Sequence, residues 1–287
     1  MVVQADLAET PKQDIDDQNL TQGWKAQLHL GFIRSGTRTL LTDRRHKGPL
    51  TVQRPFYPEG GICHVYILHP PGGIVGGDQL NIDVHAATKT AALITTPAAG
   101  KFYRSTDKQA HQSVSIKIEQ DAALEWLPQE TIIYEGARLQ SHVNIELATD
   151  ARFIGWEIIA LGRPAADEGF ECGEALLNWR IFRNEKPIYL ETMRLDAKAF
   201  TARWGLNGRS TCGTLFAYSA STANLQTVRD LIGDQPGRGV TLIDDLLICR
   251  ASGNTTEPVR NFFESVRAVL RNDIVQHENY TPRIWAT

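Results

Sequence analysis

The chain has 287 residues, of which 42% are hydrophobic and 22% are charged, and its formal net charge is -3. A chain of this length can bury a sizeable core as one large domain or two small ones, and no apolar run is long enough to span a bilayer. The slight acidic excess lacks the Lys/Arg surplus that binding to a phosphate backbone requires. The composition therefore excludes nucleic acid and a membrane from the predicted partners.

The first segment, residues 1–21, is polar and acidic. It has neither the basic stretch nor the apolar stretch that make a secretory signal, so we expect a cytoplasmic location. Its apolar content is too low to offset the entropy of ordering, which predicts a flexible arm. A single domain is expected over 22–287, with a β scaffold over about 22–220 and a helical and strand part over about 221–287.

Apolar and polar residues alternate in short runs from Trp24 to Arg194, which is the period of half-buried strands. Within this region a pattern of six positions recurs after 29 residues. The residues Val114, Ile116, Ile118, Asp121, Ala122 and Leu124 correspond to Val143, Ile145, Leu147, Asp150, Ala151 and Phe153. A looser earlier copy, with about three extra residues in its connection, runs through Leu80, Ile82, Val84 and Leu93.

A repeat of nearly fixed length is typical of stacked coils. The predicted fold class is therefore mainly β: a β-helix-like stack of strand layers with a small C-terminal α-helical addition. An antiparallel sandwich with similar successive hairpins is the alternative, because periodicity does not distinguish the two. Further along, the runs 177–182 and 188–190 are predicted to form a hairpin across a turn-rich linker.

Two amphipathic helices are predicted near the C-terminus. The first has its apolar residues at Leu225, Val228, Leu231 and Ile232. The second has them at Val259, Phe262, Phe263, Val266, Val269 and Leu270. For this second helix the sequence predicts Thr256 as the N-cap, Glu257 and Pro258 in the first turn and Arg271 in the last. We interpret its apolar stripe as a core face, and the docking of a partner is the alternative.

The most unusual local motif is the run His69, Pro70, Pro71, Gly72, Gly73, Ile74, Val75, Gly76, Gly77 and Asp78. Two prolines restrict its backbone and four glycines allow tight turns before a predicted strand over 79–85. It contains no lysine and no helix follows it, so it matches neither a P-loop nor a Rossmann fingerprint. Two interpretations stay open: a loop shaped for a function, and a scaffold corner in which His69 and Asp78 bind turn amides.

A second group of candidates consists of side chains that bind transition metals. Cys63, His64, His69 and Asp78 lie within a short stretch, and sulfur, imidazole and carboxylate suit a metal such as nickel. Their spacing matches no closed site, so no tight metal site is predicted. The cysteines form no C-x-x-C pair and are expected to be reduced and mostly buried; they are Cys63, Cys172, Cys212 and Cys249.

Carboxylates also interrupt apolar strands. Glu125 and Glu130 lie in LEWLPQE, and Glu157 lies in FIGWEIIAL. A buried, ionised Glu157 would cost several kcal/mol unless it is paired, hydrogen-bonded or hydrated, so it needs a cationic partner, a water-filled channel or an edge position. The candidate partners for simple ion pairing are Arg152, Arg163 and Lys101. No nucleophile elbow, H-E-x-x-H or EF-hand loop accompanies these carboxylates.

Five stretches, in order, carry a resemblance to a known family: GPLTVQRPFYPEG, HPPGGIVGGD, TTPAAGKFYRS, LEWLPQETI and GWEIIALGR. From about Gly23 to Tyr218 the chain resembles the urease accessory protein UreD (UreH) family, and its C-terminal part resembles that family only in general layout. The resemblance implies a β-helical fold and a non-enzymatic chaperone for urease maturation. It also implies a scaffold that joins the urease apoprotein to the accessory proteins UreF and UreG in one complex. The GTPase activity would belong to UreG, since this chain has no P-loop.

The resemblance further implies transient passage of Ni²⁺ through the protein, with no stably bound cofactor. Weak oxygen and imidazole ligands suit a metal that must be released again. We predict that the passage is lined by Asp78, Thr95, Thr96, Glu130 and Glu157. His69 is expected nearby, and contacts of His69 and Glu157 with the metal are expected to be transient at most.

Two other classes of protein are disfavoured. A β-helix enzyme acting on polysaccharide would use paired carboxylates and an aromatic groove, for which Trp126, Trp156 and Trp179 are candidates. That class is usually secreted, whereas a secretory signal is not expected here, and fold alone warrants no function. A nickel storage protein would need a higher density of His or Cys than eight scattered histidines provide.

Overall fold

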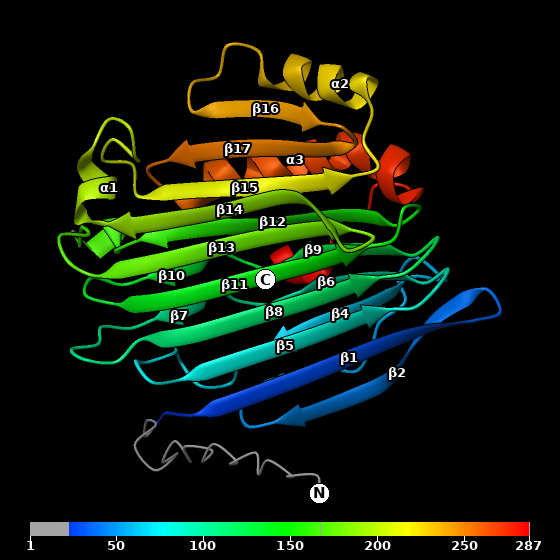
Figure 1. The fold of residues 1–287 in the computed structure, drawn as a ribbon, viewed down its shortest axis with the longest axis horizontal. Coiled ribbons are helices and arrows are strands. Elements are labelled where there is room, and N and C mark those ends of the chain that lie inside the picture. Colours follow the sequence, from blue (N-terminus) through cyan, green and yellow to red (C-terminus); the bar gives the residue numbers. More distant parts are fainter. Residues whose placement is uncertain (1–22, 167, 287) are drawn as a thin grey trace, which may run out of the picture.

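The structure, a computed structural model, describes residues 23–166 and 168–286. The arm expected over residues 1–21 lies outside the described residues. Most of the described chain forms strands, which lie in two large sheets that face each other (Figure 1). None of the helices in this part of the chain has the length and apolar character that a membrane span requires.

The first sheet has seven strands in the order β14-β13-β11-β8-β5-β1-β2. Their bounds are β1 (Lys25–Ser35), β2 (Arg38–Lys47), β5 (Gln79–Ala86), β8 (Ala110–Ile118), β11 (Arg138–Leu147), β13 (Glu174–Arg183) and β14 (Lys186–Asp196). The five central strands are parallel. The antiparallel partners β2 and β14 form the two edges of the sheet.

The second sheet runs β16-β17-β15-β12-β9-β6-β4-β3, and β7 and β10 pair beside it. The bounds are β3 (Thr51–Val52), β4 (Cys63–Leu68), β6 (Ala91–Thr95), β7 (Gly100–Phe102), β9 (Ala123–Leu127), β10 (Thr131–Ile133), β12 (Arg152–Leu161), β15 (Thr211–Tyr218), β16 (Arg238–Ile243) and β17 (Leu246–Gly253). Strands β4, β6, β9 and β12 are parallel. Strands β15, β17 and β16 continue the sheet with antiparallel pairing.

The chain alternates between the sheets, so that β5 and β6, β8 and β9, and β11 and β12 each form one coil of a stack. This arrangement confirms the predicted β-helix-like fold and excludes the antiparallel sandwich. The 29-residue repeat is confirmed as well, because Val114 lies opposite Val143 and Ile116 lies opposite Ile145 in neighbouring parallel strands. Stacking places like side chains over one another, and this is why the repeat is visible in the sequence.

The earlier copy of the repeat is present with a different register. Ile82, and not Leu80, lies opposite Val114. The connections within the two coils, Ala86 to Ala91 and Ile118 to Ala123, have equal length. The three extra residues fall between coils, because the path from Thr95 to Ala110 is longer by three than the path from Leu127 to Leu139.

Alternating side chains divide the apolar residues between two layers. One side of each strand faces the other sheet and forms an inter-sheet core that includes Val114, Ile116 and Phe153. The opposite side of the second sheet forms a second cluster, the α3 layer, which includes Trp156 and Phe263. Full burial of each large apolar side chain contributes about 1.5–3 kcal/mol, so both layers stabilise the stack.

The helices are α1 (Ala197–Thr201), α2 (Thr222–Ile232) and α3 (Thr256–Val275), and short 3-10 turns cover Pro164–Ala166 and Arg283–Ala286. Helix α3 packs against β12, β15 and β17. The interpretation of its apolar stripe as a core face is confirmed for Val259, Phe262, Phe263, Val266 and Leu270, which are buried. Val269, which is 40% exposed, was wrongly included.

Two predictions about the ends of α3 are wrong. The N-cap is Thr255 and not Thr256, and the side chain of Thr255 makes no capping hydrogen bond. Arg271 does not lie in the last turn, because the helix continues to Val275 and the Arg271 side chain is fully buried. Helix α2 begins with a capping box in which Ser221 and Asn224 satisfy each other's backbone amides.

The predicted hairpin is confirmed as β13 and β14, with longer strands than expected. Its turn consists of Asn184 and Glu185, both at positive φ, as in the two-residue turns that match the twist of a hairpin. All four cysteines are free; Cys63, Cys212 and Cys249 are buried and Cys172 is exposed. This agrees with the expectation of reduced and mostly buried thiols.

Candidate functional site

The glycine-rich loop after β4 is a tightly packed corner of the stack. Asp78 Oδ1 accepts a hydrogen bond of 2.8 Å from the Trp24 amide, and Asp78 Oδ2 accepts one of 3.0 Å from the Val75 amide. A Cβ atom at Gly73 would lie 2.2 Å from the ring of Tyr103. The Asp78 carboxylate thus connects the loop to Trp24, just before β1, and to Val75 within the loop. This is the role expected of a scaffold corner.

The same loop borders two cavities. The smaller one, of about 250 Å³, brings His69 and Asp78 together with Trp24. The larger one, of about 390 Å³, is lined by His69, the loop residues Pro70 to Gly73, and Thr96. Burial lowers the pKa of His69, and the charge of Asp78 opposes this shift, so the imidazole is predominantly neutral at pH 7 and can accept a proton or a metal.

The two threonines lie on opposite faces of the second sheet. Thr95 donates a hydrogen bond to the Leu127 carbonyl and accepts one of 2.9 Å from Trp285 Nε1, in the α3 layer. Thr96 donates to the Ala98 carbonyl at 3.1 Å and faces the larger cavity between the sheets. Neighbouring residues of an extended chain point to opposite sides, so Thr95 and Thr96 do not line the same space.

Glu130 lies just after β9 and faces α3. Its Oε2 atom is 3.4 Å from Arg260 Nη2 and has no hydrogen-bond partner among the residues that the structure describes. Arg260 Nη1 also donates a hydrogen bond of 2.5 Å to the neighbouring Gln129 side chain. Glu130 therefore shares the α3 side of the sheet with Thr95.

Glu157 lies in the middle of β12 and points between the sheets. Trp179 Nε1, on β13, donates a hydrogen bond of 3.0 Å to Glu157 Oε2. No ion pair reaches Glu157 within the described part of the chain, so the candidate partners Arg152, Arg163 and Lys101 do not neutralise it. Burial raises the pKa of Glu157 to about 7, the hydrogen bond from Trp179 opposes the shift, and the negative charge of Glu191 adds to it.

A cleft of about 590 Å³ is lined by residues of β14, β15, β16 and β17 and by the segment around α1, but not by Glu157 itself. Thr214, which lies opposite Glu157 on β15, lines this cleft together with Cys212 and Glu191. Arg250 Nη2 donates hydrogen bonds to Tyr189 Oη, at 2.7 Å, and to Glu191. The lining of the cleft therefore contains one carboxylate, Glu191, and Arg250 neutralises it.

The predicted passage residues are thus divided between two layers. His69, Asp78, Thr96 and Glu157 face the space between the sheets or its end, whereas Thr95 and Glu130 face α3. Cys63 and His64 also point in opposite directions from β4, Cys63 toward Tyr57 and His64 toward Glu59. Among the residues that the structure describes, no group of three His, Cys, Asp or Glu side chains could hold a metal ion.

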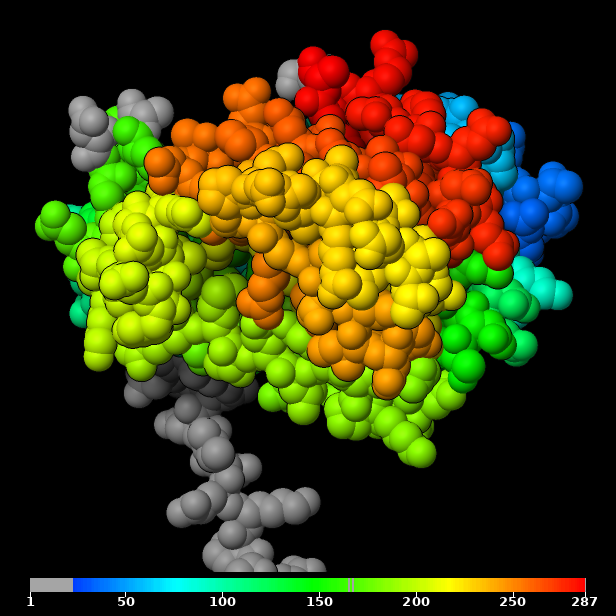
Figure 2. Space-filling model, turned by 90° about the horizontal axis from the view of Figure 1, so that it is seen from above, coloured from blue at the N-terminus to red at the C-terminus, as the bar shows by residue number. Residues whose placement is uncertain are grey.

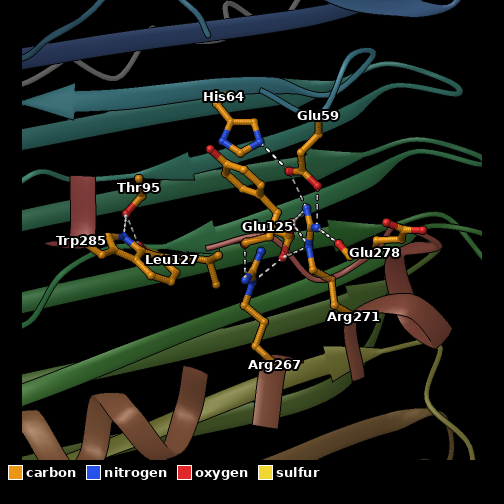
Figure 3. A network of polar contacts seen from close by, with 10 residues as sticks. Glu59, His64, Thr95, Glu125, Leu127, Arg267, Arg271, Glu278 and Trp285 are labelled. Atoms are coloured by element: carbon orange, nitrogen blue, oxygen red, sulfur yellow. Dashed lines mark hydrogen bonds and ion pairs between the residues drawn. The ribbon is translucent and has the colours of Figure 1, made fainter. Parts of the chain in front are cut away.

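A buried polar network in the α3 layer could not be located from the sequence (Figure 3). Arg267 Nε donates a hydrogen bond of 2.6 Å to Glu125 Oε1, and Arg271 Nε donates one of 3.1 Å to Glu125 Oε2. Arg271 also binds both carboxylate oxygens of Glu59, at 2.6 and 2.8 Å. His64 Nε2 is 2.7 Å from Glu59. The network links α3 to β9 and to the loop before β4.

The charges in this network are matched. Burial alone would raise the pKa of Glu125, but the two guanidinium groups outweigh it and the pKa is lowered. Burial likewise opposes ionisation of Glu59, while hydrogen bonds from His64 and Arg271 bring its pKa to about 2. Both carboxylates stay ionised at neutral pH. For Glu125, simple ion pairing explains a carboxylate in an apolar strand.

The segment that follows α3 and includes the turn Arg283–Ala286 covers this network. The carbonyls of Glu278 and Tyr280 accept hydrogen bonds from Arg271 and Arg267, and Trp285 lies 5.5 Å from Trp156, ring to ring. The run LEWLPQE contains no lysine or arginine, so the local sequence did not indicate which residues pair with Glu125. Its partners Arg267 and Arg271 lie near the other end of the sequence. Only the arginines at i and i+4 of α3, on its apolar side, could have indicated a buried acidic counterpart.

Comparison with known proteins places the chain among urease accessory proteins. The family model described as UreD urease accessory protein matches residues 25–286. The chain is 39% identical over 287 residues to a urease accessory protein UreD of Dechloromonas aromatica, covering 97% of this chain and 100% of that protein. It is 42% identical to the protein of the same name from Citrobacter koseri, with 94% of each covered. For that of Trichormus variabilis the identity is 41%, with 93% of this chain and 97% of that protein covered.

Proposed function

Because the chain belongs to the UreD family of urease accessory proteins, we propose that it is a non-enzymatic scaffold that helps to load nickel into apo-urease. In this role it joins the urease apoprotein to UreF and to the GTPase UreG, in the cytoplasm. The similarity to named urease accessory proteins over nearly the whole chain is the observation that carries this proposal. GTP hydrolysis belongs to the partner, since this sequence has no phosphate-binding loop.

The interior geometry supports a passage for the metal between the sheets. Arg267 and Arg271 neutralise Glu125, whereas Glu157 has no cationic partner in the described part of the chain. Thr214, opposite Glu157 on β15, lines a cleft of about 590 Å³. At the other end of the stack, His69 and Thr96 border a cavity of about 390 Å³. Isolated oxygen and imidazole groups bind Ni²⁺ weakly, as a cargo that is passed on must be bound. Nickel in this proposal is cargo and not a resident cofactor.

The maturation role is tested in cells that carry the urease structural genes and the other accessory genes, with this gene present or deleted and nickel supplied. We expect deletion to abolish urease activity, with normal amounts of urease subunits and depleted nickel in the purified enzyme. Unchanged activity and nickel content in the deletion strain would refute the proposal. The nickel content separates a failure of metal loading from a failure of urease expression.

The passage is tested by replacing its carboxylates. We expect Glu157→Ala to lower urease activation several-fold in the same cells, because a buried carboxylate on the route, with no ion-pair partner among the described residues, is lost. Glu130→Ala tests the α3 side of the sheet independently. The matched control is Glu146→Ala, at an exposed position on the outer face of β11, which should leave activation unchanged. Wild-type activation by both folded variants would rule out passage at these two positions.

A further inference from the structure

The two ends of the stack differ in how their outermost strands are covered. At one end, α2 packs on β16, the last strand of the second sheet, and lies over it in gold in Figure 2. At the other end, the first sheet stops at β2, which is its outermost strand in Figure 1 and packs against strands β1 and β4. An edge strand of ten residues presents a row of unpaired backbone groups unless another segment covers it.

The outer backbone edge of β2 is free over most of its length. Near the start of the strand, the Thr39 amide donates a hydrogen bond of 2.8 Å to the Gly61 carbonyl. From Leu40 to Lys47, the described part of the chain supplies no backbone hydrogen-bond partner other than β1. An edge of this kind can accept one more strand.

The end of β2 carries positive charge that the described residues do not neutralise. Arg44 and Lys47 are exposed, and so is Lys25 at the start of β1. Among the described residues, none of these three side chains forms an ion pair or donates a hydrogen bond. Arg45 differs from them, because it is paired with Asp43 at 2.9 Å. Three cations at this edge are therefore available to meet negative charge.

These cations surround the point at which the described chain begins. Lys47 lies opposite Gln27 and Arg44 lies opposite Leu30, in the antiparallel pair of β2 with β1. Residues that lie opposite each other point to the same side of a sheet. Arg44 is thus on the side of the buried Leu30, and Lys47 is on the other side. Residues 1–22 join the sheet at this basic corner, ahead of Lys25.

The segment that precedes the described residues has the opposite charge. It contains one lysine and five carboxylates, which are Asp6, Glu9, Asp14, Asp16 and Asp17. Asp14 is nine residues before Gly23, and an extended chain covers about 3.3 Å per residue. The outer edge of β2 lies only two strand spacings from β1, or about 10 Å, so these carboxylates are within reach. A tethered segment meets such a site at an effective concentration of about millimolar.

We propose that residues 12–20 add to the free edge of β2 as a further strand of the first sheet, with Asp14, Asp16 and Asp17 paired to Arg44 and Lys47. The strand would run parallel to β2, because its C-terminal end joins β1 beside Lys47. Successive side chains of a strand point to opposite sides, so Asp16 and Asp17 meet cations on both sides of the sheet.

The residue Pro11 limits the pairing at its other end, since proline has no N–H to donate to a ladder. The run Asp14–Asp17 has the same length as the run Arg44–Lys47 that it would neutralise. The added strand closes an edge that could otherwise pair with other chains. This inference is independent of the proposed role in urease maturation, because it concerns two parts of one chain.

Hydrogen exchange of the backbone amides of Leu40–Lys47 tests the proposal in the full-length chain at low salt. Charged side chains can also guard an edge that stays solvated, and exchange distinguishes such an edge from an occupied one. We expect the outward amides of the wild type to be protected. In an Asp14→Asn, Asp16→Asn, Asp17→Asn variant they should exchange at least fivefold faster, and high salt should have the same effect on the wild type.

The matched control changes the net charge equally at three exposed positions outside the β1–β2 hairpin. It combines Glu146→Gln, Glu171→Gln and Asp234→Asn, and we expect it to leave the exchange of the β2 amides unchanged. This control separates a specific pairing of residues 14–17 with β2 from a general effect of net charge.

A reversal of charge on both sides provides the sharpest test. Arg44→Glu with Lys47→Glu, both at exposed positions, should remove the protection as the Asn variant does. Addition of Asp14→Lys, Asp16→Lys and Asp17→Lys to this double variant should restore at least half of it, because the opposite charges then face each other again. Failure of this restoration in the folded protein would contradict the proposed pairing.

Three further outcomes would overturn the inference. Equal exchange of the β2 amides in the wild type and the Asn variant would leave β2 as a solvated edge guarded by its own charges. Protection that persists in the Asn variant but falls on dilution would identify a second copy of this chain as the occupant. Protection that appears only when apo-urease or UreF is added would assign the edge to that partner.

Discussion

At the scale of single residues, two glutamates in similar sequence surroundings have opposite electrostatics. Both Glu125 and Glu157 interrupt buried strands, and for Glu157 the sequence predicted a cationic partner, a water-filled channel or an edge position. Glu125 faces α3 and meets Arg267, which is 142 positions away in the sequence. Glu157 faces the other sheet, and its hydrogen-bond donor among the described residues is the indole N–H of Trp179. The face that a strand residue occupies decides which partners it can reach, and the local sequence does not contain those partners.

The raised pKa of Glu157 makes stability depend on pH. Its pKa is 4.5 in the unfolded chain and about 7 in the folded protein, so the folded state holds the proton more tightly. The wild type must then lose stability as the pH rises from about 4.5 to 7, and the loss is complete above the folded pKa. Glu157→Gln keeps the hydrogen bond from Trp179 but does not ionise. We expect it to be roughly 1–3 kcal/mol more stable than the wild type at pH 8, since one pKa unit is worth about 1.4 kcal/mol.

Urea unfolding of both proteins at pH 5 and pH 8 measures this difference. The gap between variant and wild type should be small at pH 5, where the folded wild type is protonated, and large at pH 8. An equal gap at both pH values would show that Glu157 ionises freely in the folded protein.

At the scale of elements, features that depend on local interactions were predicted better than features that depend on contacts between distant parts of the sequence. The alternation of strands and the repeat of the coils are local and periodic, so the stack and the register of β8 with β11 could be predicted. Helix α3 was placed correctly by its apolar spacing, but its length and the role of Arg271 were not. An arginine near a helix end suggests an interaction with the helix dipole, and nothing nearby in the sequence reveals that Glu59 and Glu125 fold against it.

Replacing a buried arginine of α3 should therefore cost far more than replacing an exposed one. Arg271→Met leaves the carboxylates of Glu59 and Glu125 buried with fewer partners, and loss of one member of a buried charge network typically costs about 3–5 kcal/mol. Arg45→Met is the matched control. Arg45 forms an ion pair with Asp43, but its side chain is 71% exposed, so its loss should cost less than about 1 kcal/mol.

The free energy of unfolding of both variants, from urea titration at pH 7, gives the comparison. Similar small losses in the two variants would mean that water reaches the α3 network and screens it.

At the scale of the whole molecule, the sequence predicted the architecture more fully than the candidate site. The architecture repeats, and each coil contains its own signal. The site depends on which residues of different coils share a space: Thr95 and Thr96 are adjacent in sequence but face different layers, and Glu157 on β12 contacts Trp179 on β13, in the other sheet. Neither fact has a local pattern that could reveal it.

The layer built around α3 should make the stack unfold as one unit. Coils of a solenoid contact only their neighbours, so unfolding can proceed coil by coil from an end. Here α3 and the segment after it cross the stack, because Arg271 holds Glu59 ahead of β4, both arginines hold Glu125 on β9, and Trp285 binds Thr95 on β6. Each of these hydrogen bonds connects a coil to a segment that is distant from it in the sequence. We expect far-ultraviolet circular dichroism and tryptophan fluorescence to report the same urea midpoint for the wild type.

Removal of the ion pairs of α3 should separate the unfolding transitions that circular dichroism and fluorescence report. In an Arg267→Met, Arg271→Met double variant, the part of the fluorescence change that comes from Trp156 and Trp285 in the α3 layer should precede the loss of strand signal. The inter-sheet core, which contains Trp126 and Trp179, would no longer depend on the helix. Two distinct midpoints already in the wild type would mean that the α3 layer is an independent unit resting on the stack. Coincident midpoints in the double variant would mean that apolar packing of α3 against β12, β15 and β17 is sufficient to couple the layers without the ion pairs.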